Sequence, residues 1–359
     1  MKGFEIDLLP VTSGDKSGDS IAFRYGDLQK GGEAQTVVVL DAGFAKNASE
    51  MKAHLKKYYN CVTPEGKIRI DLMIASHSDG DHVGGLAALV EDDEVEISKF
   101  WGHIPQSEMN VWWYADKRHT TKSVRTKLDE SFSQLSTIAD KLGKESLLNP
   151  YKSLRINEGR FVILSPSPDF YKKCIANSKK AELEPSVKVD PMKYPASSNT
   201  DTVDEDYVKG QIKWDYNEGT SAINESSMVF LFEYEDVKIL FCGDAGREAM
   251  ENALAQAESE GISLARLTLV KQPHHGSRKN ITPEIMAQIP ARFCFISCTK
   301  DDVGHHPSKR LVNMMNELGY KVYITSGKTL HWGKNAPDRN WSNAKQIVSY
   351  PQIEKRKEQ

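Results

Sequence analysis

The chain has 359 residues, of which 39% are hydrophobic and 27% are charged, and these are the proportions of a globular enzyme. Its 47 Lys and Arg against 50 Asp and Glu leave a net charge of −3, which excludes a polybasic nucleic-acid-binding design but allows a local basic patch. No apolar run approaches the ~18 residues that span a bilayer, the N-terminus lacks the apolar centre of a signal peptide, and the five irregularly spaced cysteines predict no disulfide framework. We therefore expect a cytoplasmic protein without a membrane partner.

The N-terminal part of the chain predicts a β-rich unit. Apolar and polar side chains alternate over 4–9 and 20–25, which is typical of strands. A continuous apolar run at 36–40 predicts a strand buried on both faces, ended by Asp41-Ala42-Gly43. The next predicted elements are a helix at 48–60, a strand at 68–75, a polar loop at 77–85 with a helix from 86, a strand at 100–102 and helical spacing over 107–148.

The stretch from about 165 to 220 differs in composition from the rest. Five of the 15 prolines lie between Pro166 and Pro195, among acidic, lysine and serine residues. We interpret it as a surface insertion or lid, and we assign 103–220 to a helical and Pro-rich insertion within a single domain of 1–359. Beyond it the pattern predicts strands at 227–234, 238–242, 265–271, 292–298 and 321–325, and helices at 247–259 and 309–318.

The densest cluster of chemically active residues is SHSDGDHVGG at 76–85. It brings His77, Asp79, Asp81 and His82 together within six residues, directly after a predicted strand. Imidazole and carboxylate are ligand types of zinc, manganese and iron, and alternate positions of an extended chain project to the same side. The alternative is a solvated turn with Asp and Gly as turn formers. Four ligands this close together favour two adjacent metal ions.

Three further polar clusters also follow predicted strands. Gly243-Asp244 comes after ILFC, where a lone Asp is typical of a turn or an N-cap. KQPHHGSRKN at 271–280 and VGHHPSKR at 303–310 each contain a His pair, and the second runs into a predicted helix whose start it can form. Six of the 10 histidines lie in the three His-containing loops, which makes a separate structural explanation for each loop less convincing than one shared site.

In order and spacing, these motifs resemble those of the metallo-β-lactamase fold. The segment at 77–82 is similar to the metal motif HxHxDH, and LDAG at 40–43 resembles the first motif of the fold. The ComEC-like branch, named for the soluble hydrolase domain of the DNA-uptake competence channel, is similar at NESS 224–227, GD 243–244, HHGS 274–277 and GHHPS 304–308. The resemblance covers roughly 4–101 and 220–335. It implies an α/β fold, a four-layer αββα sandwich with the metal site at one edge.

The resemblance also implies a role for each matching residue. The metal ligands would be His77, Asp79, Asp81, His82 and Asp244. Asp244 would bridge two divalent ions, zinc or manganese, and one of His274 and His275 would complete the second site. Asp41 would fix the loop that carries the ligands.

The chain departs from the pattern of this family at two positions. Asp79 replaces the middle His of the metal motif, and a carboxylate is a harder ligand that shifts the preference towards manganese. The His expected before the GD strand is missing, and Asn224 is the nearest residue. One of the two metal sites is therefore expected to be weaker or more open.

Two cations about 3.5–4 Å apart lower the pKa of a bridging water and present hydroxide to an electrophile. We expect Asp81 to orient this hydroxide as well as to bind metal. His306, or His305, would donate a proton to the leaving group or bind a phosphate oxygen, and the alternative is that either residue caps its helix. Residues suited to an anionic substrate are Lys271, Ser277, Arg278 and Lys279, although Ser277 is equally suited to hydrogen-bond a neighbour of a ligand.

A stretch at 111–127, VWWYADKRHTTKSVRTK, places aromatic residues beside cations. Aromatic rings that stack on bases, with cations on phosphates, are the usual means of binding single-stranded nucleic acid. The alternative is that Trp112 and Trp113 pack a helix onto the core while the cations face water. Cys294 and Cys298 lie on an apolar strand and are expected in the core.

The sequence thus predicts a metal-dependent hydrolase that uses a metal-bridged hydroxide. Our first hypothesis is a phosphodiesterase or nuclease whose partner is a phosphodiester substrate, with single-stranded nucleic acid as one form of it. A hydrolase of a small ester, thioester or lactam is the alternative enzyme, and a closed pocket under the insertion would favour it. The alternative from another class is a non-catalytic binding or sensor module stabilised by metal.

Overall fold

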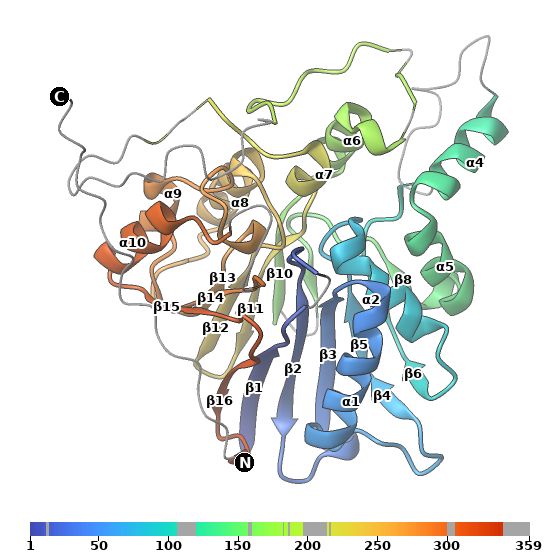
Figure 1. Ribbon diagram of the computed structural model, residues 1–359, viewed down its shortest axis with the longest axis vertical. Coiled ribbons are helices and arrows are strands. Elements are labelled where there is room, and N and C mark those ends of the chain that lie inside the picture. Colours follow the sequence, from blue (N-terminus) through green and yellow to red (C-terminus); the bar gives the residue numbers. More distant parts are fainter. Residues whose placement is uncertain are drawn as a thin grey trace.

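The computed structural model describes residues 1–11, 14–105, 120–156, 160–181, 183–185, 187–196, 214, 217–299 and 306–339. Two sheets of seven strands each face one another, and helices cover the outer face of both (Figure 1). This arrangement is the four-layer αββα sandwich, and it confirms the predicted fold class.

The first sheet joins the N-terminal strands to one strand from the C-terminal part of the chain. In spatial order its strands are β16 (Leu330–Lys334), β1 (Lys2–Leu8), β2 (Ser20–Asp27), β3 (Gln35–Ala42), β5 (Leu72–Ile74), β7 (Phe100–Trp101) and β8 (Leu147–Leu148). Pairing is antiparallel from β16 to β3 and parallel from β3 to β8. A separate pair is formed by β4 (Ile68–Ile70) and β6 (Val95–Ile97).

The second sheet uses the C-terminal half of the chain and the middle. Its strands, again in spatial order, are β15 (Lys321–Ile324), β14 (Ala291–Ile296), β13 (Leu267–Lys271), β12 (Val237–Phe241), β11 (Val229–Tyr234), β10 (Phe161–Ser165) and β9 (Arg155–Ile156). The strands from β12 to β15 are parallel, because helices connect them, whereas β9 to β12 are antiparallel.

Phenylalanine side chains fill the space between the sheets. Phe232 of β11 lies 5.2 Å from Phe23 of β2, 5.5 Å from Phe4 of β1 and 5.0 Å from Phe161 of β10, measured between ring centroids. All four side chains are at most 1% exposed. This layer fixes the distance between the sheets and therefore holds their edges together.

The helices form the outer layers. Against the first sheet lie α1 (Ala48–Tyr58), α2 (Gly80–Val90) and α5 (Ser133–Leu142), and against the second lie α6 (Pro168–Asn177), α8 (Arg247–Ser259), α9 (Pro283–Gln288) and α10 (Lys309–Glu317). A smaller apolar cluster links α4 (Thr121–Ser131), α6 and α7 (Ala222–Glu225). Among the described residues, no helix combines the length and apolar character needed to cross a membrane.

The middle of the chain contributes more to the sheets than its composition predicts. β8, β9, β10 and the helix α6 lie within the range assigned to the insertion, and the three strands belong to the two large sheets. The division into one domain with an insertion over 103–220 remains a prediction, but its residues 147–165 supply strands to the sandwich itself. Cys294 and Cys298 are buried in the core, as expected.

Candidate metal centre

The predicted site residues meet at one edge of the sandwich, where the parallel strands of both sheets end. Asp41 lies near the end of β3 and His77 follows β5 in the first sheet. Asp244 follows β12 and His275 follows β13 in the second. The carboxyl ends of parallel strands lie on the same side of a sheet, so these loops converge although they are far apart in the sequence. In Figure 1 this edge lies at the top, below α6 and α7.

Asp244 lies at the centre of the cluster. Its Oδ2 atom is 3.4 Å from Nε2 of His82, 3.7 Å from Nε2 of His275 and 4.0 Å from Nε2 of His77. Burial favours the neutral acid, but His82, His275 and His274 hold the pKa of Asp244 well below its usual range. Asp244 is therefore an ionised carboxylate surrounded by imidazole nitrogens.

Asp81 completes one side of this cluster. Its Oδ2 atom is 3.8 Å from Nε2 of His82 and 3.6 Å from Nε2 of His275. Asp81 and Asp244 thus face His82 and His275, and the four distances between their Oδ2 and Nε2 atoms are 3.4–3.8 Å. Ligands bound tetrahedrally at about 2.0–2.2 Å from one ion are separated by roughly 3.3–3.6 Å. The four side chains therefore match the size of a metal-binding site with little movement.

His77 and Asp79 form the other side. Nε2 of His77 is 3.7 Å from Oδ2 of Asp79 and 4.0 Å from Oδ2 of Asp244. Asp79 is the N-cap residue of α2, but its side chain makes no capping hydrogen bond. The carboxylate instead faces His77 with one oxygen and Lys180 with the other, so it does not serve merely as a turn or cap residue.

Buried atoms without hydrogen bonds test whether the residues fit a metal. Among the described residues, Nε2 of His77, His82 and His275 and Oδ1 of Asp244 are buried and have no hydrogen-bond partner. A polar atom left in this state costs about 1–3 kcal/mol. Divalent cations coordinated by these atoms would satisfy them, and His and Asp are suitable ligands for zinc and manganese. The donor set therefore fits the predicted metals.

The other ring nitrogen of each histidine has a partner that fixes the ring. Nδ1 of His77 lies 3.0 Å from Oγ of Ser76, and Nδ1 of His275 lies 2.9 Å from the carbonyl oxygen of Ser297. Nδ1 of His82 lies 2.9 Å from Oδ2 of Asp41. Such contacts at Nδ1 leave Nε2 of each ring directed to the centre, which is the orientation a metal ligand needs.

The backbone at two positions allows the loops to approach closely. Asp41 has a φ of 53°, a left-handed conformation that turns its carboxylate toward Ser76 and His82. A Cβ atom on Gly85 of α2 would lie 2.0 Å from the carbonyl oxygen of Ala42, so only glycine lets α2 pack against the end of β3. Both features position the HSDGDH loop.

Charge attraction dominates the titration of the cluster. Burial opposes a charge on His82, but Asp244, Asp41 and Asp81 raise the pKa of this imidazole well above its ordinary value. Burial also favours neutral Asp81, and the neighbouring His82 and His275 lower the pKa of its carboxyl group. The carboxylates that attract a proton to His82 would attract a divalent cation in its place.

Asp19, which no sequence motif had indicated, lies below the centre. Asp19 is buried, its Oδ1 atom is 3.6 Å from Nδ1 of His275, and its Oδ2 atom is 3.8 Å from Nδ1 of His82. It also forms an ion pair with Lys271, whose ammonium donates to the carbonyl oxygen of Gly243 at 3.1 Å. The signal in the sequence is weak, because Asp19 ends a polar stretch that looks like a turn before β2.

Lys271 is 1% exposed, so it faces the carboxylates and not the solvent. Its Nζ atom is 4.0 Å from Oδ1 of Asp244, and burial lowers its pKa less than Asp19 and Asp244 raise it. Lys271 therefore compensates negative charge beneath the cluster. The described contacts of Lys271 are with Asp19, Asp244 and Gly243, and its predicted role toward an anionic substrate remains a prediction.

The structure distinguishes the two histidines of the HHGS loop. Both residues have left-handed backbone, with φ of 45° for His274 and 54° for His275, and their side chains have different partners. His275 faces Asp81 and Asp244. His274 lies 3.8 Å from Oδ2 of Asp244 through Nε2, which is also 3.3 Å from Nδ2 of Asn224. Burial lowers the pKa of His274 to about 4, which keeps its imidazole neutral at neutral pH.

Asn224 and Asn280 hold His274 in place. Nδ2 of Asn224 is 2.8 Å from Oγ1 of Thr220, and Oδ1 of Asn280 is 2.9 Å from Nδ1 of His274. Asn280 also donates to the carbonyl oxygen of Asp244 at 2.9 Å. Asn224, predicted near the position of the missing His, therefore lies beside the cluster and contacts a histidine of the next motif.

The remaining predicted residues lie around this centre or outside the described residues. The ring of His306 is 5.2 Å from that of His274 and 6.0 Å from that of His275, between centroids, so His306 lies beside the cluster. Ser277 is buried, and its Oγ atom accepts from the N–H of Lys279 at 3.2 Å. Arg278 is partly exposed on the same loop. His305 lies outside the described residues.

The basic stretch is described only in its second half, as α4. Val124 and Leu128 are buried, while Lys122 and Arg125 are exposed. This part of the helix therefore packs on the core with one face and presents cations to solvent with the other. Trp112, Trp113, Lys117, Arg118 and His119 lie outside the described residues.

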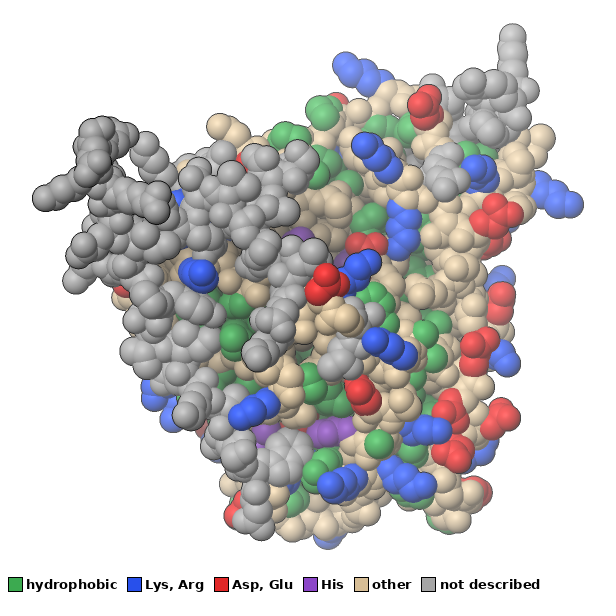
Figure 2. All heavy atoms as spheres, in the orientation of Figure 1, with side chains coloured by type: hydrophobic (Ala, Val, Ile, Leu, Met, Phe, Trp, Pro, Cys, Tyr) green, Lys and Arg blue, Asp and Glu red, His purple; other side chains and the backbone are tan. Residues whose placement is uncertain are grey.

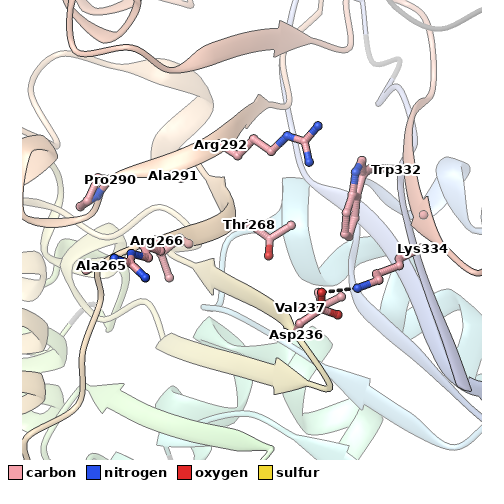
Figure 3. Close-up of a pocket in the computed structure, with 12 residues that line it drawn as sticks. Asp236, Val237, Ala265, Arg266, Thr268, Pro290, Ala291, Arg292, Trp332 and Lys334 are labelled. Atoms are coloured by element: carbon pink, nitrogen blue, oxygen red, sulfur yellow. Dashed lines mark hydrogen bonds and ion pairs between the residues drawn. The ribbon is translucent and has the colours of Figure 1, made fainter.

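The space-filling view shows histidine atoms at two places on this face of the molecule. In Figure 2, purple atoms are visible at depth in the upper part, near red carboxylate and blue basic side chains, and a second purple area lies in the lower part. A different cavity, of about 730 Å³, lies at the opposite ends of β13 and β14 and is lined by Thr268, Arg292 and Trp332 (Figure 3). Its lining contains none of the predicted site residues.

Comparison with solved structures finds similar folds at low identity. The yeast PDE1 structure covers 92% of this chain and 99% of its own, with 12% identity and a TM-score of 0.43. Zn²⁺-bound PqqB from Methylobacterium extorquens covers 91% of this chain and 99% of its own, with 10% identity and a TM-score of 0.42. A metal-dependent hydrolase of the β-lactamase superfamily covers 93% of this chain and 100% of its own, with 10% identity and a TM-score of 0.41.

No family model matches the chain, and no curated protein sequence matches it. A functional assignment therefore depends on the geometry of the site.

Proposed function

We propose that this protein is a metal-dependent hydrolase whose metal centre is the His/Asp cluster at the sheet edge. The observation that carries the proposal is the convergence of three buried Nε2 atoms, of His77, His82 and His275, on Asp244 without hydrogen-bond partners among the described residues. A purely structural cluster would satisfy these atoms by hydrogen bonds. Here Nδ1 of each ring is fixed and Nε2 is left for a ligand.

The residues divide into two groups that share Asp244. Asp81, His82 and His275 would hold one divalent ion with it, and His77 and Asp79 would hold the other. We assign the ligand role in the HHGS loop to His275, because His274 faces the amides of Asn224 and Asn280. Two bound cations would supply an activated water and stabilise charge on the leaving oxygen.

We propose a phosphodiester as the substrate. Paired cations suit an in-line displacement at phosphorus, where charge develops on both the attacking and leaving oxygens. Described cationic side chains around the edge, Lys180, Arg278 and Lys279, are partly exposed and suit an anionic ligand. His306, whose ring lies 5.2 Å from that of His274, would donate a proton to the leaving group. Single-stranded nucleic acid is one form of such a substrate.

The experiment combines metal analysis with activity. Purified protein is stripped with chelator, reloaded with Mn²⁺ or Zn²⁺, and assayed on single-stranded DNA, RNA, cyclic nucleotides and bis(p-nitrophenyl) phosphate. We expect bound metal and hydrolysis of at least one phosphodiester that returns only on reloading. Activity confined to carboxylic esters, thioesters or lactams would replace the phosphodiester by the alternative substrate class. Metal-replete protein inert on all of them would contradict an enzyme and support a binding or sensor module.

A further inference from the structure

Lys180 reaches the predicted metal centre from the middle of the chain. Its Nζ atom is 3.0 Å from Oδ1 of Asp79, and it also donates to the carbonyl oxygen of Ser78. Asp79 directs its other oxygen to His77. One carboxylate can therefore face a metal with Oδ2 and the ammonium with Oδ1, so that the two contacts do not exclude each other.

The backbone that carries Lys180 is fixed by apolar packing. Lys180 lies in a short 3-10 turn, Lys179–Ala181, after α6. Ala181 is 0% exposed and belongs to a cluster with Val124, Leu128 and Phe132 of α4 and its C-terminal end. The ammonium also lies 5.5 Å from the ring centroid of Phe132. The position of this cation is therefore built into the fold and does not depend on a mobile surface chain.

Two lysines, Lys180 and Lys271, offset part of the negative charge of the His/Asp cluster. The described cluster contains five carboxylates, of Asp19, Asp41, Asp79, Asp81 and Asp244, and two lysines pair with members of it, Lys180 and Lys271. Lys271 is buried beneath them, whereas the side chain of Lys180 is 28% exposed. The ammonium of Lys180 has three N–H donors. Among the described residues, Ser78 and Asp79 accept hydrogen bonds from two of them.

From this geometry we infer that Lys180 is a substrate-binding residue that holds a negatively charged, non-bridging oxygen of the phosphodiester beside the metal centre. This inference rests on the proposed function and makes it more specific. The remaining N–H of Lys180 would donate to that oxygen, while Asp79 and Ser78 keep the ammonium in place. A charge-assisted hydrogen bond of this kind discriminates anionic from neutral esters.

The test measures phosphate binding and turnover separately in manganese-loaded protein. Inorganic phosphate is titrated at equilibrium, and kcat and KM are determined for bis(p-nitrophenyl) phosphate. We expect Lys180→Met to raise the Kd of phosphate and the KM of the diester about tenfold, with kcat and bound manganese nearly unchanged. Lys180→Arg, which keeps the charge, should stay within about threefold of the unaltered protein.

Lys179→Met is the matched control, because Lys179 is the exposed neighbour in the same turn. If Lys180→Met and Lys179→Met bind phosphate equally well, or if the unaltered protein binds none, the inference is wrong. A lower unfolding temperature of Lys180→Met with unchanged Kd would likewise overturn it and make the ion pair with Asp79 structural. Phosphate binding through Lys180 without hydrolysis of any phosphodiester would contradict the proposed function but support this inference.

Discussion

Nδ1 of His82 lies 2.9 Å from Oδ2 of Asp41, and this contact determines which ring nitrogen of His82 faces Asp244. The same carboxylate accepts from the N–H of Ser76 at 2.8 Å and from its hydroxyl at 2.6 Å. Asp41 thus connects the end of β3 to both ends of the ligand loop. With the proposed ligand set, Asp41 would not bind the metal itself but would orient the residues that do.

The first prediction concerns this orientation. Asp41→Asn keeps the shape of the side chain but removes the charge that fixes the Nδ1–H form of His82. Loss of such a contact typically lowers metal affinity by about 10–100-fold. We expect this reduction in the Mn²⁺ or Zn²⁺ affinity measured by competition with a chelator.

Asp71→Asn is the control for that measurement. Asp71 directly precedes β5 of the same sheet and accepts from the N–H of Val37 at 2.7 Å, but none of its described contacts involves the cluster. It should change metal affinity less than about twofold. Equal losses in Asp41→Asn and Asp71→Asn would show that Asp41 acts on the fold rather than on the site.

The second prediction concerns the ligands themselves. Asp81→Ala and His82→Ala each remove a side chain that faces the shared space around Asp244. Either change should lower metal-dependent hydrolysis by at least about 100-fold and reduce the metal bound per chain. The circular dichroism spectrum should be unchanged, because the inter-sheet core does not include these residues. Activity retained by both variants in the presence of chelator would rule out this site.

Much of this centre could be predicted from the sequence, because the end of an apolar run marks the end of a strand. The apolar runs at 36–40 and 238–242 end in Asp41 and Gly243-Asp244, and the structure ends β3 and β12 there. Within one sheet, the residues that follow parallel strands lie at the same edge. Because β3 and β12 belong to different sheets, the juxtaposition of His77 and His82 with Asp244 also requires the face-to-face packing of the two sheets, which the resemblance implied and local patterns do not show.

Lys180 and Asp19 could not be found in this way. Lys180 is 101 residues from Asp79 in the sequence and reaches it only because α4 and α6 pack together. Asp19 looks like a turn residue until β2 pairs with β3 and brings it beneath His82. Strands such as β8 and β9 have two residues each, too few to show any periodicity.

The third prediction concerns the buried ion pair of Asp19 and Lys271. Lys271→Met leaves the buried carboxylate of Asp19 without its ammonium, and breaking one member of such a pair typically costs about 3–5 kcal/mol. We expect this loss in the free energy of unfolding of metal-free protein, measured with urea. The double variant Lys271→Met/Asp19→Asn should recover part of the loss. A double variant less stable than Lys271→Met alone would contradict a compensating role for Lys271.

The fourth prediction tests the exposed cations of α4. Lys122 and Arg125 are exposed on this helix, whose other face is buried through Val124 and Leu128. If they contact phosphates, Lys122→Gln/Arg125→Gln should weaken binding of single-stranded DNA and reduce the slope of log affinity against log salt by about 1–2. The stability should be unchanged. An unaltered slope would dismiss α4 as a nucleic-acid surface and leave its cations as solvated side chains.

The fifth prediction is a pH dependence that lies away from the metal centre. His103 is buried between the rings of Tyr151 and Tyr171, at 4.6 and 4.8 Å between centroids, and its Nε2 atom is 2.7 Å from the carbonyl oxygen of Pro150. Burial lowers the pKa of His103 from 6.5 to about 4, although the contact with Pro150 opposes this.

The unfolded chain therefore binds a proton at His103 at a higher pH than the folded chain does. Above pH 6.5, His103 is neutral in both states and does not reduce the free energy of unfolding. As the pH falls from 6.5 to about 4, its protonation in the unfolded chain lowers the free energy of unfolding by about 3 kcal/mol. In His103→Gln the amide retains a donor for Pro150 but does not titrate. We expect the free energy of unfolding of the unaltered protein to fall by this amount relative to His103→Gln between pH 7.5 and 4, measured with urea in metal-free protein. Parallel curves of the free energy of unfolding against pH for the two proteins would show that protonation of His103 does not destabilise the fold. That result would contradict the lowered pKa of this buried residue.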